Sequence, residues 1–327
     1  MQRISPVLKA KLPPVQAGWF DYRYSILADG SLAVLRATYD VRSALRERHA
    51  MMAAATVGQP LPPLCPEGTM ARLSVFDGTA ETAGFEFELE SSHPLFDRLD
   101  DRRWLVVAAP WMDGGPNARI FDNQGSVERR FCLGDGIEHL QCDARRNIWV
   151  GYFDEGVFGN DDWTPDTALV EARLGINRFD EHGRMSWAYP NEDLADCYAM
   201  NVTPEAVWAC YYPYFPILRI GWDGSSRLWE NSTKGAHLLA VDGADVVLLG
   251  LYAGEARVGR LVRLTDETSP SRLARCLTQT RGEFVFDLNG HEPRRLDYHG
   301  ARGDKIHFVH DGNWYVLSVG QIVRAFE

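Results

Sequence analysis

The sequence predicts an all-β fold, a single six-bladed β-propeller of four-stranded antiparallel blades. Three observations favour this fold: a turn followed by a short apolar strand recurs along the chain, the recurrence has a period of about 40–45 residues, and helical periodicity is nearly absent. Five or seven blades stay open as alternatives. A pair of β-sandwiches or a large barrel also stays open, because those folds show short strands at regular spacing too.

Each unit of the repeat contains two hairpins. Every turn holds Asp, Gly or Pro, and β-branched or aromatic residues form the strand that follows it. The first hairpins lie at 28–39, 100–111, 143–153, 203–212 and 242–252, and the second at 74–89, 119–131, 177–189, 219–230 and 260–274. The spacing is constant, since 45 residues separate Trp104 from Trp149 and also Phe76 from Phe121. Two hairpins per period are the four strands of one propeller blade.

The two ends of the chain are expected to meet in the last unit. The stretch 302–327 has the pattern of a sixth blade, which the N-terminal strand would complete. The segment 277–298 fits the repeat least well. Because the blades of a propeller close into one ring, we expect a single domain over 1–327.

One stretch carries a resemblance to known propellers. The segment 139–158, HLQCDARRNIWVGYFDEGVF, resembles the repeat of NHL and two-component-regulator-type propellers, in which an Asp-containing turn precedes a Trp-Val/Ile-Gly strand. The segment 174–201 is similar to uncharacterised bacterial six-bladed propeller proteins. The resemblance covers most of 70–253 and implies the fold, not a chemistry. The Gly-His and Trp-Asp signature of WD repeats is missing from the sequence.

Two long insertions interrupt the repeat. Residues 40–70 begin with Asp40 as the expected N-cap of a short helix over about 41–56, and a proline-rich return follows. Residues 154–172 form the second insertion. In antiparallel blades these loops and the links between blades lie on one end of the propeller. There they either bind a partner or simply cap the central channel.

Composition excludes several classes of function. The chain has 34 Lys and Arg against 45 Asp and Glu, a formal net charge of −11, which disfavours nucleic acid and favours a partner with a basic surface. The N-terminus lacks the apolar core of a signal peptide, and no apolar run approaches the roughly 18 residues of a membrane span, so a cytoplasmic protein without membrane contact is expected. The 6 cysteines are scattered without a CxxC pair, which argues against a zinc ribbon or a disulfide framework.

The end with the insertions combines acidic and aromatic residues, a mixture typical of protein-binding surfaces. The motif YYPYFP at 211–216 is hard to bury as a whole. The predicted partner-binding residues are Trp111, Asp154, Glu155, Asp161, Asp162, Trp163, Tyr211, Tyr212, Tyr214 and Phe215. The first hypothesis is therefore a non-enzymatic, cofactor-free propeller that binds another protein, for example a bacterial immunity-type protein neutralising a toxin. The opposite end carries the arginine pairs 102–103 and 145–146.

The alternative hypothesis is a metal-dependent, lactonase-like hydrolase that acts on a small polar substrate at the channel mouth. Hard oxygen ligands suit Ca²⁺ or Mg²⁺, and the residues predicted to supply them are Glu138, Asp154, Asp196 and Asn201. His307 and His310 are three residues apart on a strand, so they point to opposite faces and do not chelate together. No GxSxG, HExxH or SxxK motif supports other hydrolytic chemistry. A small-ligand sensor without chemistry would use the same pocket.

Overall fold

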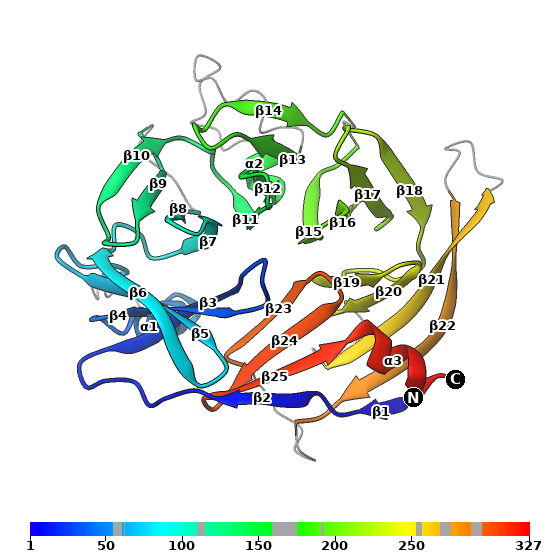
Figure 1. The fold of residues 1–327 in the computed structure, drawn as a ribbon, viewed down its shortest axis with the longest axis horizontal. Helices are drawn as coiled ribbons and strands as arrows, with labels where there is room; N and C mark the ends of the chain where they lie inside the picture. Colours follow the sequence, from blue (N-terminus) through cyan, green and yellow to red (C-terminus); the bar gives the residue numbers. More distant parts are fainter. Residues whose placement is uncertain are drawn as a thin grey trace.

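The computed structural model describes residues 1–54, 61, 63–109, 115–158, 175–190, 193–252, 257–268, 276–288 and 296–327. Sheets of mainly antiparallel strands stand around a common axis, which is the arrangement of a β-propeller (Figure 1). Four of the sheets have four strands each.

From the inside outward, these four sheets contain the following strands: β3 (Phe20–Ile26), β4 (Leu32–Ala37), β5 (Met70–Asp77) and β6 (Ala80–Glu88) in the first; β7 (Pro94–Asp100), β8 (Arg103–Ala108), β9 (Ala118–Asp122) and β10 (Val127–Phe131) in the second; β11 (Ile137–Cys142), β12 (Ile148–Tyr152), β13 (Ile176–Phe179) and β14 (Met185–Ala188) in the third; and β23 (Tyr298–Arg302), β24 (Lys305–His310), β25 (Asn313–Ser318) and β2 (Val7–Lys11) in the fourth.

The prediction of six separate blades is wrong, because the remaining strands form one nine-stranded sheet. These strands are β15 (Asp196–Val202), β16 (Ala206–Tyr212), β17 (Ile217–Gly221), β18 (Ser226–Glu230), β19 (Leu238–Asp242), β20 (Asp245–Leu249), β21 (Val258–Thr268), β22 (Cys276–Phe286) and β1 (Gln2–Ile4). The cause is the length of β21 and β22, which have 11 residues each and extend past their neighbours. The start of β22 thereby reaches β18 and pairs with it in parallel, Trp229 opposite Cys276 and Glu230 opposite Leu277. The unpaired edge of a long strand readily accepts such a partner.

The N-terminal strand completes the last four-stranded sheet, as expected from the sequence. β2 pairs with β25 from Val7 opposite Val316 to Lys11 opposite Asn313. The C-terminal helix α3 (Val319–Ala325) follows β25 and contacts β19 and β20. Both chain ends therefore lie close together beside the nine-stranded sheet (Figure 1).

Aspartates hold the tight turns that the sequence pattern predicts. The Oδ1 atom of Asp143 accepts hydrogen bonds from the backbone N–H groups of Arg145 at 2.8 Å and Asn147 at 3.0 Å. Asp122 and Asp180 accept two backbone hydrogen bonds in the same way. Such Asx turns reverse the chain locally, which explains why the hairpins recur wherever this residue recurs.

Both insertions begin with a helix. α1 (Val41–Ala53) has Asp40 as its N-cap, whose carboxylate accepts from the backbone N–H of Ser43 at 2.9 Å, as predicted. The second insertion begins with α2 (Asp154–Phe158), which contacts β12 and β15. Residues 55–60 and 62 of the first insertion and 159–172 of the second lie outside the described residues.

Candidate binding site at the channel mouth

The two ends of the propeller differ in their connections. We call the end at which the innermost strands begin the loop end, because the links between successive four-strand runs and the loops that carry α1 and α2 lie there. The tight turns between the first and second strands of each run lie at the opposite end, which we call the turn end. This division decides which side chains share a surface.

A cavity of about 520 Å³ occupies the channel on the side of the loop end. Its polar lining residues include Arg23, Glu138, His139, Tyr198, His237 and His299. The three histidines come from three places in the chain, β11, the residue before β19, and β23. The sequence pattern did not single out His299, and it left His139 and His237 ambiguous, because only closure of the ring brings them to one cavity.

A buried polar belt closes the cavity toward the turn end. Arg302 on β23 pairs with Asp97 on β7 at 3.1 Å, and Asp97 accepts the backbone N–H of Cys142 at 2.7 Å. Gln141 on β11 accepts the backbone N–H of Val202 at 2.7 Å. Gln141 lines the loop-end cavity, whereas Arg302 lines a second cavity of about 280 Å³ at the turn end. The belt therefore joins several inner strands and separates the two cavities.

Asn201 belongs to this belt and lies away from the other three residues predicted as metal ligands. Its amide nitrogen donates to the carbonyl oxygens of Leu239 at 2.9 Å and Gly303 at 2.8 Å, and its oxygen accepts the N–H of Gly303 at 2.8 Å. Asp196 begins β15, whereas Asn201 is near its end, roughly 16 Å away along an extended strand. The amide is thus engaged in joining strands, on the far side of the cavity floor.

The other three predicted ligands gather at the cavity mouth. Glu138 is at the start of β11, Asp154 begins α2, and Asp196 begins β15. Burial, followed by the negative charges of Asp154 and Glu138, raises the pKa of Asp196 to about 7. The charges of Glu138 and Asp154 thus act on Asp196, and we call the three carboxyl groups the acidic cluster.

A group with metal-ligand spacing lies elsewhere at this end. Within the described part of the chain, the ligand atoms of Asp297, His310 and Asp311 lie within 4.8 Å of one another, and the Glu138, Asp154 and Asp196 carboxylates do not form such a group. The Nε2 atom of His310 is 3.4 Å from Asp311 Oδ2. One imidazole and two carboxylates are donors that zinc accepts. His307 lies apart from this group, buried against Trp314.

The YYPYFP loop divides its aromatic side chains between the core and the surface. Tyr211 and Phe215 are buried, whereas Tyr212 is 49% exposed and Tyr214 is 68% exposed. Tyr214 and Phe215 have φ angles of 71° and 52°, in the left-handed region that is unfavourable for bulky residues. The side chain of Asn231 holds this conformation by donating to the Phe215 carbonyl oxygen at 3.1 Å. Such a backbone is retained only where its surroundings enforce it.

Tyr198 is the centre of an aromatic wall at the cavity mouth. Its ring centroid is 5.1 Å from that of Phe215, 5.6 Å from that of Tyr252, and 5.1 Å from the His237 ring, on which it stacks. The hydroxyl groups of Tyr198 and Tyr252 are hydrogen-bonded. Burial, this hydrogen bond and the nearby charges of Tyr252, Asp196 and Asp154 raise the pKa of Tyr198. The aromatic wall and the acidic cluster are therefore neighbours.

The exposed aromatic side chains are concentrated on the same end. In the described ranges, the large aromatic residues with high exposure are Phe20, Phe158, Tyr212, Tyr214 and Tyr252. Each lies where an inner strand begins or in a loop after the second strand of a run, so all of them are on the loop end. Phe20 and Tyr252 were not predicted as site residues, because neither is part of an aromatic motif.

The other predicted partner-binding residues divide into two sets. Asp154 and Glu155 are exposed on α2, at the edge of the acidic cluster. Trp111, Asp161, Asp162 and Trp163 lie outside the described residues.

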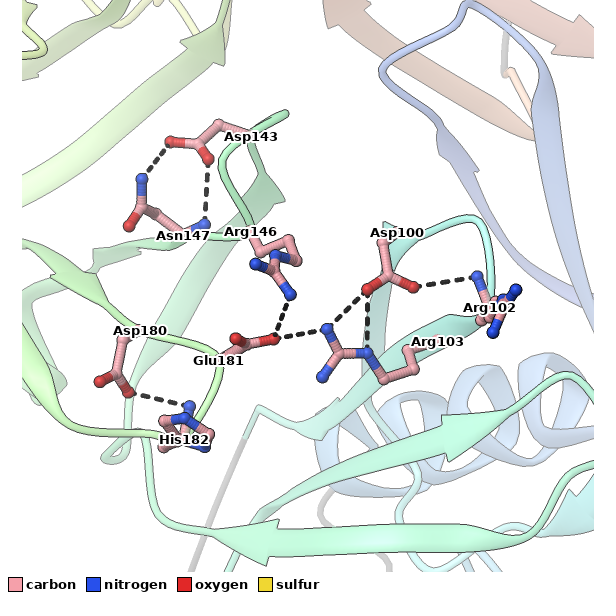
Figure 2. Close-up of polar contacts among 9 residues, drawn as sticks. All are labelled: Asp100, Arg102, Arg103, Asp143, Arg146, Asn147, Asp180, Glu181 and His182. Carbon is pink, nitrogen blue, oxygen red and sulfur yellow. Dashed lines mark hydrogen bonds and ion pairs between the residues drawn. The ribbon is translucent and has the colours of Figure 1, made fainter.

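The arginine pairs of the turn end are engaged within the protein. Figure 2 shows Glu181, in the turn between β13 and β14, between Arg103 of the preceding sheet and Arg146 of its own sheet. Arg103 also pairs with Asp100, and Arg145 lies 4.5 Å from the Trp222 ring centroid. Arg103 and Arg145 thus contact neighbouring sheets, Arg146 pairs within its own sheet, and Arg102 donates to Asp100 through its backbone N–H.

The chain is similar to one sequence family over part of its length and to several solved structures. A sequence profile described as the YxzG family matches residues 173–249. No curated protein sequence matches the chain. Similar solved structures include Kluyveromyces lactis Hsv2, with 12% identity over 91% of this chain and 74% of that chain at a TM-score of 0.49. The Pan2 WD40 domain of Neurospora crassa has 11% identity over 90% of this chain and 88% of that chain, with a TM-score of 0.45. A gluconolactonase from Xanthomonas campestris has 10% identity over 68% of this chain and 70% of that chain, with a TM-score of 0.39.

The sheet arrangement defines the chain as a β-propeller. Its structural relatives are too distant in sequence to assign an activity, because one fold hosts many functions. Within the described ranges, no helix is long and apolar enough to cross a membrane.

Proposed function

We propose that this propeller is a non-enzymatic binding protein whose loop end engages a partner protein with a basic surface. The observation that carries the proposal is the concentration of exposed aromatic residues on that end beside the acidic cluster of Glu138, Asp154 and Asp196. Exposed tyrosines supply contact area at a low cost in side-chain entropy, and clustered carboxylates steer a cationic surface toward them. Neutralisation of a basic toxin by an immunity-type protein is one function of this kind.

The charge distribution narrows the docking position on the loop end. The carboxylates lie on the side of β11, α2 and β15, where Tyr212 and Tyr214 also lie. On another side, α1 carries Arg42, Arg46 and Arg48. A basic partner is therefore expected to cover the β11–β15 side and to avoid α1, because like charges that face each other weaken association.

Quantitative affinity purification from the source cells tests this surface. The bait proteins are wild type, Asp154→Lys, the double variant Tyr212→Ala/Tyr214→Ala, and the control Glu205→Lys, which changes an exposed carboxylate on the turn end. We expect one basic protein to be retained by wild type and the control and to fall at least tenfold with both loop-end variants. Equal retention by all four baits, or equal loss with the control, would overturn the proposed face.

A second candidate function, metal-dependent hydrolysis of a small polar substrate, is favoured by the Asp297, His310 and Asp311 group beside the cavity. Elemental analysis of the purified protein tests it. A stoichiometric divalent metal in the wild type that is lost in His310→Ala would support this function. Absence of such a metal would exclude a metal-dependent reaction at this group.

A further inference from the structure

We infer that the channel mouth is a receptor for a guanidinium group, supplied by an arginine side chain that the partner inserts between the acidic cluster and the aromatic wall. This inference rests on the proposed function, because it names the partner residue that the loop end recognises. Three features of the mouth support it: clustered carboxylates, flat aromatic rings, and a cavity larger than one side chain.

Hydrogen-bond acceptors are concentrated at the cavity mouth. The carboxylates of Glu138 and Asp154 repel that of Asp196 at the mouth, and this repulsion is relieved when a cation enters. His139 lines the cavity beside Glu138, and its Nε2 atom is buried without a hydrogen-bond partner.

The aromatic wall selects among cations. Tyr198 stacks on His237 and contacts Phe215 and Tyr252 edge to face. Planar guanidinium groups stack on such rings and offer five donors in a fixed geometry, whereas an ammonium group is a compact, strongly hydrated charge. The combination of several acceptors with flat rings favours arginine over lysine.

The cavity has the size and the polarity that an arginine side chain requires. Its volume of about 520 Å³ exceeds that of one side chain, and Leu140 and Met200 line it between the polar groups. Arg23 on β3 and Asp297 before β23 also face the cavity, from elements other than β11 and β15. Among the residues that the structure describes, Arg23 is the one arginine of the cavity lining, and its charge repels a cation on the β3 side. The cation-binding side is therefore the side of β11, α2 and β15.

Titration with small probes tests this site without the partner. N-acetyl-arginine amide carries the guanidinium group as its only charge, and N-acetyl-citrulline amide is its neutral, nearly isosteric counterpart. We expect saturable binding of the arginine probe by calorimetry or NMR, at least tenfold weaker binding of the lysine analogue, and none of the citrulline analogue. The double variant Glu138→Gln/Asp196→Asn should weaken the arginine probe at least tenfold, and Glu205→Gln should leave it unchanged.

Competition with the retained partner separates this inference from the proposed function. If the arginine probe binds and displaces the partner, the inference is supported. If the arginine probe fails to bind, or binds equally to the double variant, the guanidinium site is refuted even when the partner is retained. If the probe binds but the partner remains bound to the double variant, the partner does not insert an arginine here, and the loop-end proposal stands on the affinity purification alone.

Discussion

The titration of Asp196 offers a quantitative test of the acidic cluster. Asp196 is partly buried, and burial together with the charges of Asp154 and Glu138 raises its pKa from 3.8 to about 7. In the unfolded chain the same carboxyl group ionises near its ordinary value. The folded protein therefore holds a proton on this residue over a pH range in which the unfolded chain has released it.

The sign of the effect on stability follows from proton linkage. Between about pH 4 and pH 7 the folded state binds more protons than the unfolded state, so the Asp196 contribution to the free energy of unfolding falls as the pH rises and becomes constant above about pH 8. A pKa change from 3.8 to about 7 corresponds to at most ~4 kcal/mol, at about 1.36 kcal/mol per tenfold change in proton affinity. Because water reaches part of the carboxyl group and screens its neighbours, we expect about 1–2 kcal/mol.

The substitution Asp196→Asn replaces the carboxyl group with a neutral group of the same shape. Urea unfolding followed by tryptophan fluorescence should show equal stability of wild type and variant at about pH 3, below the ordinary pKa of the carboxyl group, and a gain of about 1–2 kcal/mol for the variant at pH 8. Glu205→Gln, on the exposed surface of the turn end, should show no such pH-dependent difference. The reasoning is refuted if Asp196→Asn is no more stable than wild type at pH 8, or if its gain is the same at both pH values.

Three further predictions concern the framework that positions the site. Arg302→Met should destabilise the fold by about 3–5 kcal/mol in urea unfolding, because it leaves Asp97 buried without its cationic partner. Adding Asp97→Asn should recover part of the loss, and additive losses would contradict a coupled pair. Glu181→Gln should lower the free energy of unfolding by at most about 1 kcal/mol, because it removes two ion pairs near the surface. Thermal unfolding at two salt concentrations should show a smaller difference between wild type and variant in about 1 M salt. Gly183→Ala should destabilise by about 1–3 kcal/mol, since its φ is 78° and a Cβ atom there would lie 2.4 Å from a neighbouring phenylalanine ring; an unchanged melting temperature would contradict this.

The local elements of this fold could be predicted because they depend on local chemistry. An aspartate at positions such as 143 and 180 reverses the chain by accepting backbone N–H groups only two and four residues away. Asp40 caps α1 through contacts within three residues. The pairing of the N-terminal strand with the last hairpin was also predictable, because the final unit lacks one strand of its own.

The number of sheets could not be predicted in the same way. The segment that fitted the repeat least well contains β22, which is the strand that joins two four-strand runs through Trp229 and Glu230. Whether two strand edges meet depends on how far each strand extends and where the ring places it. Neither quantity is encoded in the spacing of turns.

The candidate site, like the fold, could be predicted only in part. The sequence indicated an acidic and aromatic end, and it named Glu138, Asp154 and Asp196 among the oxygen ligands. It assigned all four aromatic residues of the YYPYFP loop to the binding surface, whereas Tyr211 and Phe215 are buried and only Tyr212 and Tyr214 are exposed, because the composition of a loop does not say which of its side chains pack inward.

The sequence by itself determined the hairpins, their aspartate turns, the cap of α1 and the end of the propeller that carries the long loops, since each depends on residues that are near one another in the chain. Only the tertiary structure decided that Asn201 joins strands, that Glu181 engages the turn-end arginines, and that three histidines face one cavity beside the acidic cluster. These residues come from separate strands and meet only when the sheets close around the axis. Their proximity, burial and pKa values are consequences of that closure.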